Sequence, residues 1–94
     1  MWRVEGTRRV AKRLARFGRR IRERYDRAFE RLAHDPLAGE LLSGYEGLRS
    51  LPVTTPGGEH RIIYQLKPEA QVVLVVLVGP REEIYRLLER SGLG

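Results

Sequence analysis

Two arginines and a tyrosine stand at the edges of two hydrophobic segments, and these side chains could act on a phosphodiester without a metal. Arg61 opens the segment 61–66, Arg81 follows the strongly apolar segment 72–78, and Tyr85 comes four residues later. A guanidinium binds two phosphate oxygens at once through its planar fork. A tyrosine can stack on a base or accept a proton from a ribose 2′-hydroxyl. In a small basic chain, this set of residues indicates RNA as the first substrate to consider.

The two arginines are expected to be neighbours in space, although 20 residues separate them in the sequence. If segments 61–66 and 72–78 pair as a hairpin through a turn at 67–70, their outer ends lie together. Adjacent guanidiniums repel each other unless an anion bridges them, so this arrangement predicts a phosphate site. Arg49, on the preceding strand, is expected to reach the same face and to contact RNA.

An ordinary structural role is the alternative for the same residues. Either arginine could form a surface ion pair with Glu59, Glu82 or Glu83, and Tyr85 could belong to the core of a last helix. The two histidines are isolated, with no second histidine or carboxylate at the spacing of a metal site. We therefore expect neither a metal ion nor a cofactor.

Positive charge is concentrated in the first third of the chain. Residues 1–31 carry 12 basic and 4 acidic residues, a net charge of +8, whereas residues 32–94 carry 6 and 8, a net charge of −2. Such a region attracts nucleic acid or an acidic protein. Lys12, Arg13 and Arg16 are expected to contact RNA phosphates, with binding that weakens as salt rises. A solvated helix face is the alternative.

Length and composition favour one domain over residues 1–94. Hydrophobic residues make up 41% of the chain, which is ordinary for a globular protein. No segment approaches the roughly 20 apolar residues of a membrane-spanning helix, and no membrane contact is expected. Cysteine is absent, which excludes a disulfide scaffold and thiolate chemistry. Since no secretory signal is visible either, we expect a cytoplasmic location.

The spacing of apolar residues predicts a short strand and then two helices. Trp2 and Val4 alternate with polar residues, as in a strand. Thr7 is suited to cap a first helix. A break at Gly18 separates it from a second amphipathic helix over residues 19–34, which ends before a proline. The two helices are expected to form an antiparallel hairpin in which each buries one apolar stripe.

The remaining chain predicts strands and a last helix. Residues 37–47 indicate a loop with at most one helical turn. The predicted strands are 48–53, 61–66 and 72–78, with a turn at 54–58 and a helix at 82–89. Pro52 favours a sheet edge for the first of these strands, whereas the last is apolar on both faces and therefore central. The order β-α-α-β-β-β, with a final helix, predicts an α+β fold whose helix hairpin packs on a mostly antiparallel sheet.

Several motifs resemble those of the RelE and ParE toxins of bacterial and archaeal toxin–antitoxin pairs. Residues 79–85 resemble the C-terminal motif of this superfamily, and residues 59–64 resemble its central strand. The predicted order of elements is also similar to that of the family. The loop after the helix hairpin adds Asp35-Pro36, Gly39, Leu42, Gly44 and Leu48-Arg49.

Resemblance to the RelE branch implies an enzyme that binds in the ribosomal A site, against messenger and ribosomal RNA, and cuts the message. The 2′-hydroxyl would attack the adjacent phosphate and leave a 2′,3′-cyclic phosphate. By residue match, Arg61 would stabilise the phosphorane, and Arg81 would bind the phosphate or protonate the leaving oxygen. Tyr85 would act as a base or stack on the codon. The resemblance also implies an acidic antitoxin protein as partner.

Two departures from the family leave alternatives open. Leu51 stands where a second basic residue is frequent, and Pro80 stands where some members have histidine. A degenerate member that binds its antitoxin without cutting RNA is one alternative. The other is the ParE branch, which shares the fold but inhibits DNA gyrase by protein contact. The combination of Arg61, Arg81 and Tyr85 favours the RelE branch.

Overall fold

Eight helices and strands make up the protein in a computed structural model that describes residues 1–91; the last three residues of the expected domain lie outside the described residues. The elements are β1 (Arg3–Gly6), α1 (Arg8–Arg16), α2 (Arg19–His34), β2 (Glu40–Leu41), β3 (Leu48–Thr55), β4 (Gly58–Lys67), β5 (Val72–Pro80) and α3 (Arg81–Ser91). Within this part of the chain, no helix is long and apolar enough to cross a membrane.

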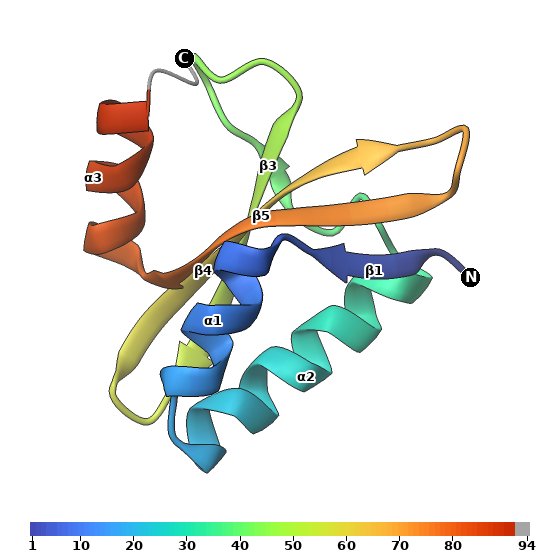
Figure 1. Ribbon diagram of the computed structural model, residues 1–94. Helices are drawn as coiled ribbons and strands as arrows, with labels where there is room; N and C mark the ends of the chain where they lie inside the picture. Colours follow the sequence, from blue (N-terminus) through green and yellow to red (C-terminus); the bar gives the residue numbers. More distant parts are fainter. Residues whose placement is uncertain (92–94) are drawn as a thin grey trace.

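The strands form one mixed sheet in the order β1-β5-β4-β3-β2 (Figure 1). β1 and β5 are parallel, and the other neighbouring pairs are antiparallel. β5 is an interior strand between β1 and β4, as its apolar sequence predicts, although β4 takes the middle position. The α+β fold with a mostly antiparallel sheet is therefore confirmed.

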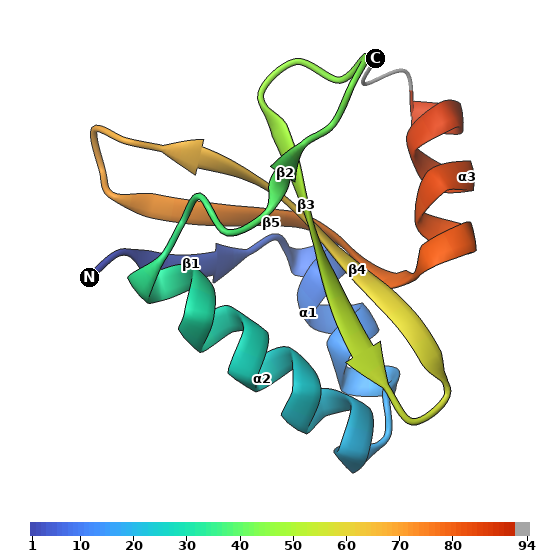
Figure 2. The same cartoon turned by 180° about the vertical axis from the view of Figure 1, so that it is seen from behind.

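The helices cover both faces of the sheet. α1 and α2 lie on one face, whereas α3 lies on the other (Figures 1 and 2). The core under α1 and α2 contains Val10, Tyr25, Leu32, Leu51, Val53, Ile62, Tyr64, Val73, Val75 and Val78. The smaller core under α3 contains Leu48, Ile63, Leu77, Ile84 and Leu88. Because β4 and β5 are buried on both faces, these two strands contribute side chains to both cores.

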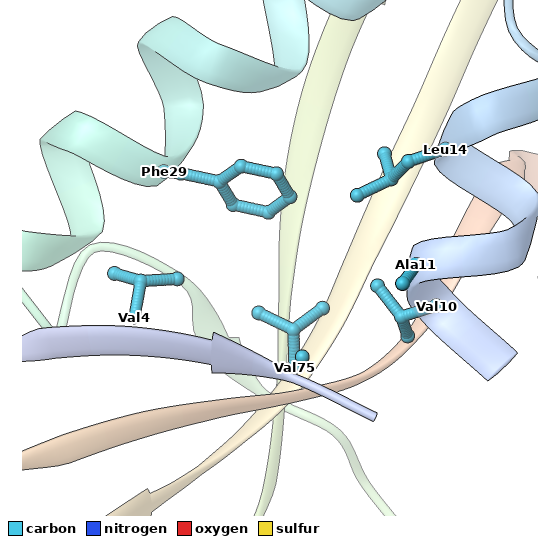
Figure 3. Close-up of a pocket in the computed structure, with 7 residues that line it drawn as sticks. Val4, Val10, Ala11, Leu14, Phe29 and Val75 are labelled. Atoms are coloured by element: carbon cyan, nitrogen blue, oxygen red, sulfur yellow. The ribbon is translucent and has the colours of Figure 1, made fainter. Parts of the chain in front are cut away.

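The first helix begins and ends where the sequence predicts. The hydroxyl of Thr7 accepts a hydrogen bond from the Val10 amide at 3.2 Å and so caps α1. Gly18 separates the two helices, and Asp35 caps the end of α2. The two helices diverge from their joint (Figure 1). They leave an apolar pocket between them (Figure 3).

The segment 37–47 contains no helical turn and instead forms the short strand β2. Glu40 pairs with Ser50 and Leu41 with Arg49. Two residues are too few for a period-2 pattern, so this strand carries no sequence signal. Because β2 covers only the beginning of β3, Pro52 still lies on an open edge of the sheet, where a proline is tolerated.

The strands are longer than their apolar patterns predict. β3 runs to Thr55 and β4 begins at Gly58, whose φ of +127° is accessible to glycine, so the turn between them is shorter than expected. β5 continues through Gly79 and Pro80 to the first residue of α3. Cross-strand pairing, rather than the apolar pattern, sets these ends.

A bulge divides the β4–β5 pairing into two registers. Tyr64 pairs with Val75, but Ile63 pairs with Leu77, so Val76 has no partner in β4. An extra residue inverts the alternation of side chains beyond it. Val75 and Val78 therefore both face α1 and α2, although three positions separate them.

Gly39 is packed too closely for a side chain. Its amide donates to the Tyr64 hydroxyl at 2.8 Å, and that hydroxyl donates to the Pro36 carbonyl at 2.8 Å. A Cβ at this position would lie 2.7 Å from the Tyr64 hydroxyl oxygen and 2.9 Å from the Ser50 carbonyl oxygen. The loop that carries β2 is thus fixed to the sheet through a contact that requires glycine.

Substituting Gly39→Ala is expected to lower the free energy of unfolding by about 1–3 kcal/mol, because the new methyl group forces Tyr64 or the loop to move. Gly57→Ala is the matched control, since a Cβ at that position would meet no atom within 4 Å beyond its chain neighbours. That variant should stay within about 0.5 kcal/mol of wild type. Urea unfolding measures both, and equal midpoints for the two variants would contradict the close packing of Gly39.

Candidate functional site

The register of β4 and β5 brings the predicted site residues together. Arg61 pairs with Gly79 and His60 with Pro80, so the start of β4 lies beside the end of β5. Arg81 follows Pro80 directly as the first residue of α3. The site lies where β5 runs into α3 (Figure 1). The expectation that the outer ends of the two strands meet is confirmed.

The carboxylate of Glu59 joins the two arginines. Its Oε2 atom lies 2.8 Å from Nε and 2.8 Å from Nη2 of Arg61, and 3.5 Å from Nε of Arg81. Two guanidiniums therefore converge on one anionic oxygen, which offsets their mutual repulsion. The bridging anion that the arginine pair requires is supplied here by the chain itself.

The two arginines differ in how firmly they are held. The Arg61 side chain is 20% exposed, and its Nη1 donates to the Ser50 hydroxyl at 3.3 Å in addition to the contacts with Glu59. The Arg81 side chain is 54% exposed. Arg61 is a fixed positive charge, whereas Arg81 is more accessible to a ligand.

Tyr85 lies next to Arg81, as the four-residue spacing predicts. The guanidinium carbon of Arg81 is 5.3 Å from the centre of the Tyr85 ring, a cation–π contact. The partly buried ring also packs against the core under α3. Tyr85 thus has both of the expected contacts, with an arginine of the site and with the core.

Arg49 is not part of this cluster, which corrects the expectation that it reaches the face of Arg61. It pairs with Tyr64, whose side chain lies in the core under α1 and α2. Arg49 Nη1 donates to the Gly39 carbonyl at 2.7 Å. Paired residues in an antiparallel sheet point to the same face, and successive residues of a strand point to alternate faces. Arg49 therefore shares the face of Tyr64, whereas Arg61, three positions before Tyr64, points to the opposite face. Leu51, on the face of Arg49, is buried in the same core.

Of the three basic residues expected to contact RNA on α1, the structure exposes two. Lys12 and Arg16 are exposed. Arg13 instead forms an ion pair with Glu83 of α3, with 2.8 Å between Nη2 and Oε1. Its Nη2 also lies so close to Gly79 that a Cβ there would be 2.8 Å away. The Arg13 side chain therefore connects α1 with the beginning of α3.

His60 belongs to a buried network on the face opposite Arg61. Its Nδ1 lies 2.8 Å from the Tyr25 hydroxyl, and its ring meets Phe17 edge-on. Burial lowers the pKa of His60 below its usual value, and the positive charge of Arg13 lowers this pKa further. Burial also raises the pKa of the Tyr25 hydroxyl. His60 is thus a structural residue that is neutral at neutral pH.

The sequence prediction left the role of Glu59 undecided among three carboxylates. The sequence contained a signal that favours Glu59 as the partner of Arg61, because the two residues are two positions apart in a strand and so share a face. Glu83, by contrast, reaches Arg13. No local pattern predicted that pair, because its two residues come from helices at opposite ends of the chain.

Comparison with known proteins identifies the family. A sequence model of the ParE toxin of the parDE type II toxin–antitoxin system matches residues 4–85. No curated protein sequence matches the chain.

Solved structures of RelE toxins share the fold. The Escherichia coli toxin RelE, as a doubly substituted mutant in the free state, matches with a TM-score of 0.76 and 23% identity over 98% of both chains. The intact E. coli RelBE toxin–antitoxin complex gives 0.74 and 22%, over 85% of this chain and 96% of that chain. The RelBE2 complex of Mycobacterium tuberculosis gives 0.72 and 25%, over 85% and 91%.

The buried histidine predicts a pH-dependent stability. Above the usual His pKa of 6.5, both folded and unfolded states hold neutral His60. As the pH falls below that value, the unfolded state gains a proton that the folded state resists, so stability is lost. His60→Gln should therefore lose less stability between about pH 7 and about pH 5 than wild type does.

Urea unfolding at a series of pH values measures this difference in slope. His34→Gln is the matched control, because His34 lies at the end of α2 and outside the network. It should not flatten the slope. A wild-type slope retained in His60→Gln would show that His60 does not resist protonation.

Proposed function

The chain belongs to the ParE toxin family of type II toxin–antitoxin systems, and from that premise we propose that it is a ribosome-dependent endoribonuclease of the RelE kind. The observation that carries this proposal is the convergence of Arg61 and Arg81 on one anionic oxygen beside an aromatic ring. Two guanidiniums around one anion are suited to a phosphodiester and to the additional charge of its transition state.

In the proposed reaction, the ribose 2′-oxygen attacks the adjacent phosphorus while the bond from phosphorus to the 5′-oxygen breaks. The 2′-hydroxyl loses its proton and the departing 5′-oxygen gains one, which leaves a 2′,3′-cyclic phosphate and a free 5′-hydroxyl. No metal or cofactor enters this chemistry. These two proton transfers require one proton acceptor and one proton donor near the phosphate.

The residues divide this work according to how they are held. Arg61, the less exposed of the two arginines and a donor to the Ser50 hydroxyl, stabilises the charge that develops on the phosphorane. Arg81, which is more exposed, binds the phosphate or protonates the leaving oxygen. Tyr85 accepts the 2′-hydroxyl proton or stacks on a base of the codon. Electrostatic stabilisation by the two arginines is the main catalytic contribution.

The basic first helix supplies the proposed contacts with the ribosome. Lys12 and Arg16 are exposed on α1, where they reach ribosomal RNA phosphates. Arg13 and Arg49 are left out of the proposed RNA contacts, because the side chain of each is engaged within the protein. The proposed location is accordingly the cytoplasm, in the A site of ribosomes that carry a message.

An acidic antitoxin is the proposed protein partner. The compared RelBE structures are toxin–antitoxin complexes. In this chain, the apolar pocket between α1 and α2 has a volume of about 250 Å³ (Figure 3). The exposed bases Lys12 and Arg16 belong to the same helix as three of the pocket residues. A segment that folds on binding would place apolar residues in the pocket and carboxylates against those bases. The pocket residues are Val4, Gly6, Val10, Ala11, Leu14, Phe29 and Val75.

Gyrase inhibition is a second candidate function, favoured by the match to the ParE model over residues 4–85. In that case the protein acts by contact with gyrase and Arg61 and Arg81 serve only as surface charges. The two candidates differ in their first observable effect. A nuclease stops translation and cuts messages, whereas a gyrase inhibitor leaves purified translation intact.

Primer extension on a defined message in a purified translation system tests the proposal. We expect discrete cuts at A-site codons that require ribosomes, and Arg81→Ala should reduce cleavage by roughly 100-fold or more. Arg86→Ala is the matched control, because it removes the same charge from an exposed position of the same helix. It should cut like wild type.

An intact message with normal protein synthesis would contradict the nuclease proposal. A gyrase supercoiling assay would then follow, and inhibition of supercoiling would support the ParE-like function. Equal loss of cleavage in Arg81→Ala and Arg86→Ala would show that only the overall charge matters.

A further inference from the structure

The Glu59 carboxylate occupies the fork of Arg61 that is suited to bind a phosphate. Arg61 directs Nε and Nη2 to the Oε2 atom of Glu59, and its Nη1 donates to the Ser50 hydroxyl. Every nitrogen of this guanidinium therefore already has a partner. A phosphate that approaches the fork formed by Nε and Nη2 must replace the Glu59 carboxylate.

The Glu59 carboxylate has room to move away. It is 40% exposed and lies one residue after Gly58, where the turn between β3 and β4 ends. It borders an open hollow of about 370 Å³ that also contains Arg81 and Glu82. Rotation of one side chain into this hollow frees Arg61 without any change in the sheet.

We propose that Glu59 is a resident anion, which holds Arg61 and Arg81 together in the free protein and is exchanged for the phosphodiester when substrate binds. With Glu59 in place, the three side chains carry a net charge of +1; after exchange, the phosphate meets the full charge of +2. The identity of the phosphodiester as RNA rests on the proposed function, but the exchange itself does not.

The exchange makes binding selective. A carboxylate tethered beside the arginines competes with any phosphate, so a ligand that offers one phosphate alone binds weakly. A substrate held by further contacts displaces Glu59 despite this competition. Glu59 thus favours messages held on a large partner over free RNA in solution.

Titration of the free protein with inorganic phosphate tests the exchange directly. The arginine Nε–Hε resonances report binding by NMR at constant ionic strength. Glu59→Gln keeps the shape of the side chain and removes its charge, so phosphate should bind roughly twofold to fivefold more tightly, the range expected for an ion pair of this exposure.

Glu82→Gln is the matched control. Glu82 borders the same hollow and carries the same charge, but it forms no ion pair with either arginine within residues 1–91. Its removal should change phosphate affinity by less than about twofold, because an exposed charge that pairs with neither arginine is largely screened. Arg61→Ala in the Glu59→Gln background should abolish the gain.

Several outcomes overturn the proposal. Phosphate affinity in Glu59→Gln that equals wild type, falls below it, or only matches Glu82→Gln would show that Glu59 does not compete for the arginines. A dispersed amide spectrum establishes that the variant is folded, and Glu59→Ala provides a second test if it is not. Since no RNA is used, absence of nuclease activity leaves the result on exchange unaffected.

Discussion

The antiparallel pairing of β4 with β5 is the constraint on which the site depends. It turns a separation of 20 positions in the sequence into direct proximity between Arg61 and Arg81. The bulge at Val76 matters here, because it changes the partner of Arg61 from Val78 to Gly79 and inverts the faces of the following β5 residues. The extra residue in β5 thus determines which β5 residue lies beside Arg61, two positions before Arg81.

The two faces of the sheet differ in their polar groups. On the face of α1 and α2, Tyr25 and His60 form a buried polar pair surrounded by aromatic rings. On the face of α3, Arg61 meets Glu59 near the solvent. Consecutive residues of β4 thus supply a structural histidine and an arginine of the candidate site. Arg13 links the two sides by reaching past Gly79 to Glu83. The chain has room for Arg13 only because Gly79 lacks a side chain.

The charged residues of the candidate site form ion pairs, although the chain as a whole has an excess of positive charge. The chain has a net charge of +6, and the two arginines at the centre of the site share the carboxylate of Glu59. Exposed ion pairs of this kind contribute little to stability, roughly 0.2–1 kcal/mol each. Their small energy is an advantage at a binding site, because a ligand can replace one partner at low cost. The pair of Arg13 with Glu83 is similarly exposed, but it connects α1 with α3, whereas Arg61 and Glu59 belong to the same strand.

Local patterns determined much of this structure. The alternation and helical periodicity of apolar residues predicted both large helices, the three long strands and the cap at Thr7, because such patterns depend only on neighbouring residues. The hairpin of β4 and β5, and with it the meeting of Arg61 and Arg81, also followed from the sequence. Only the tertiary structure placed Arg49 on the other face, formed β2, and selected Glu59 from three nearby carboxylates. Those outcomes depend on register and packing between distant segments, and several pairings of similar local energy compete until the whole sheet is assembled.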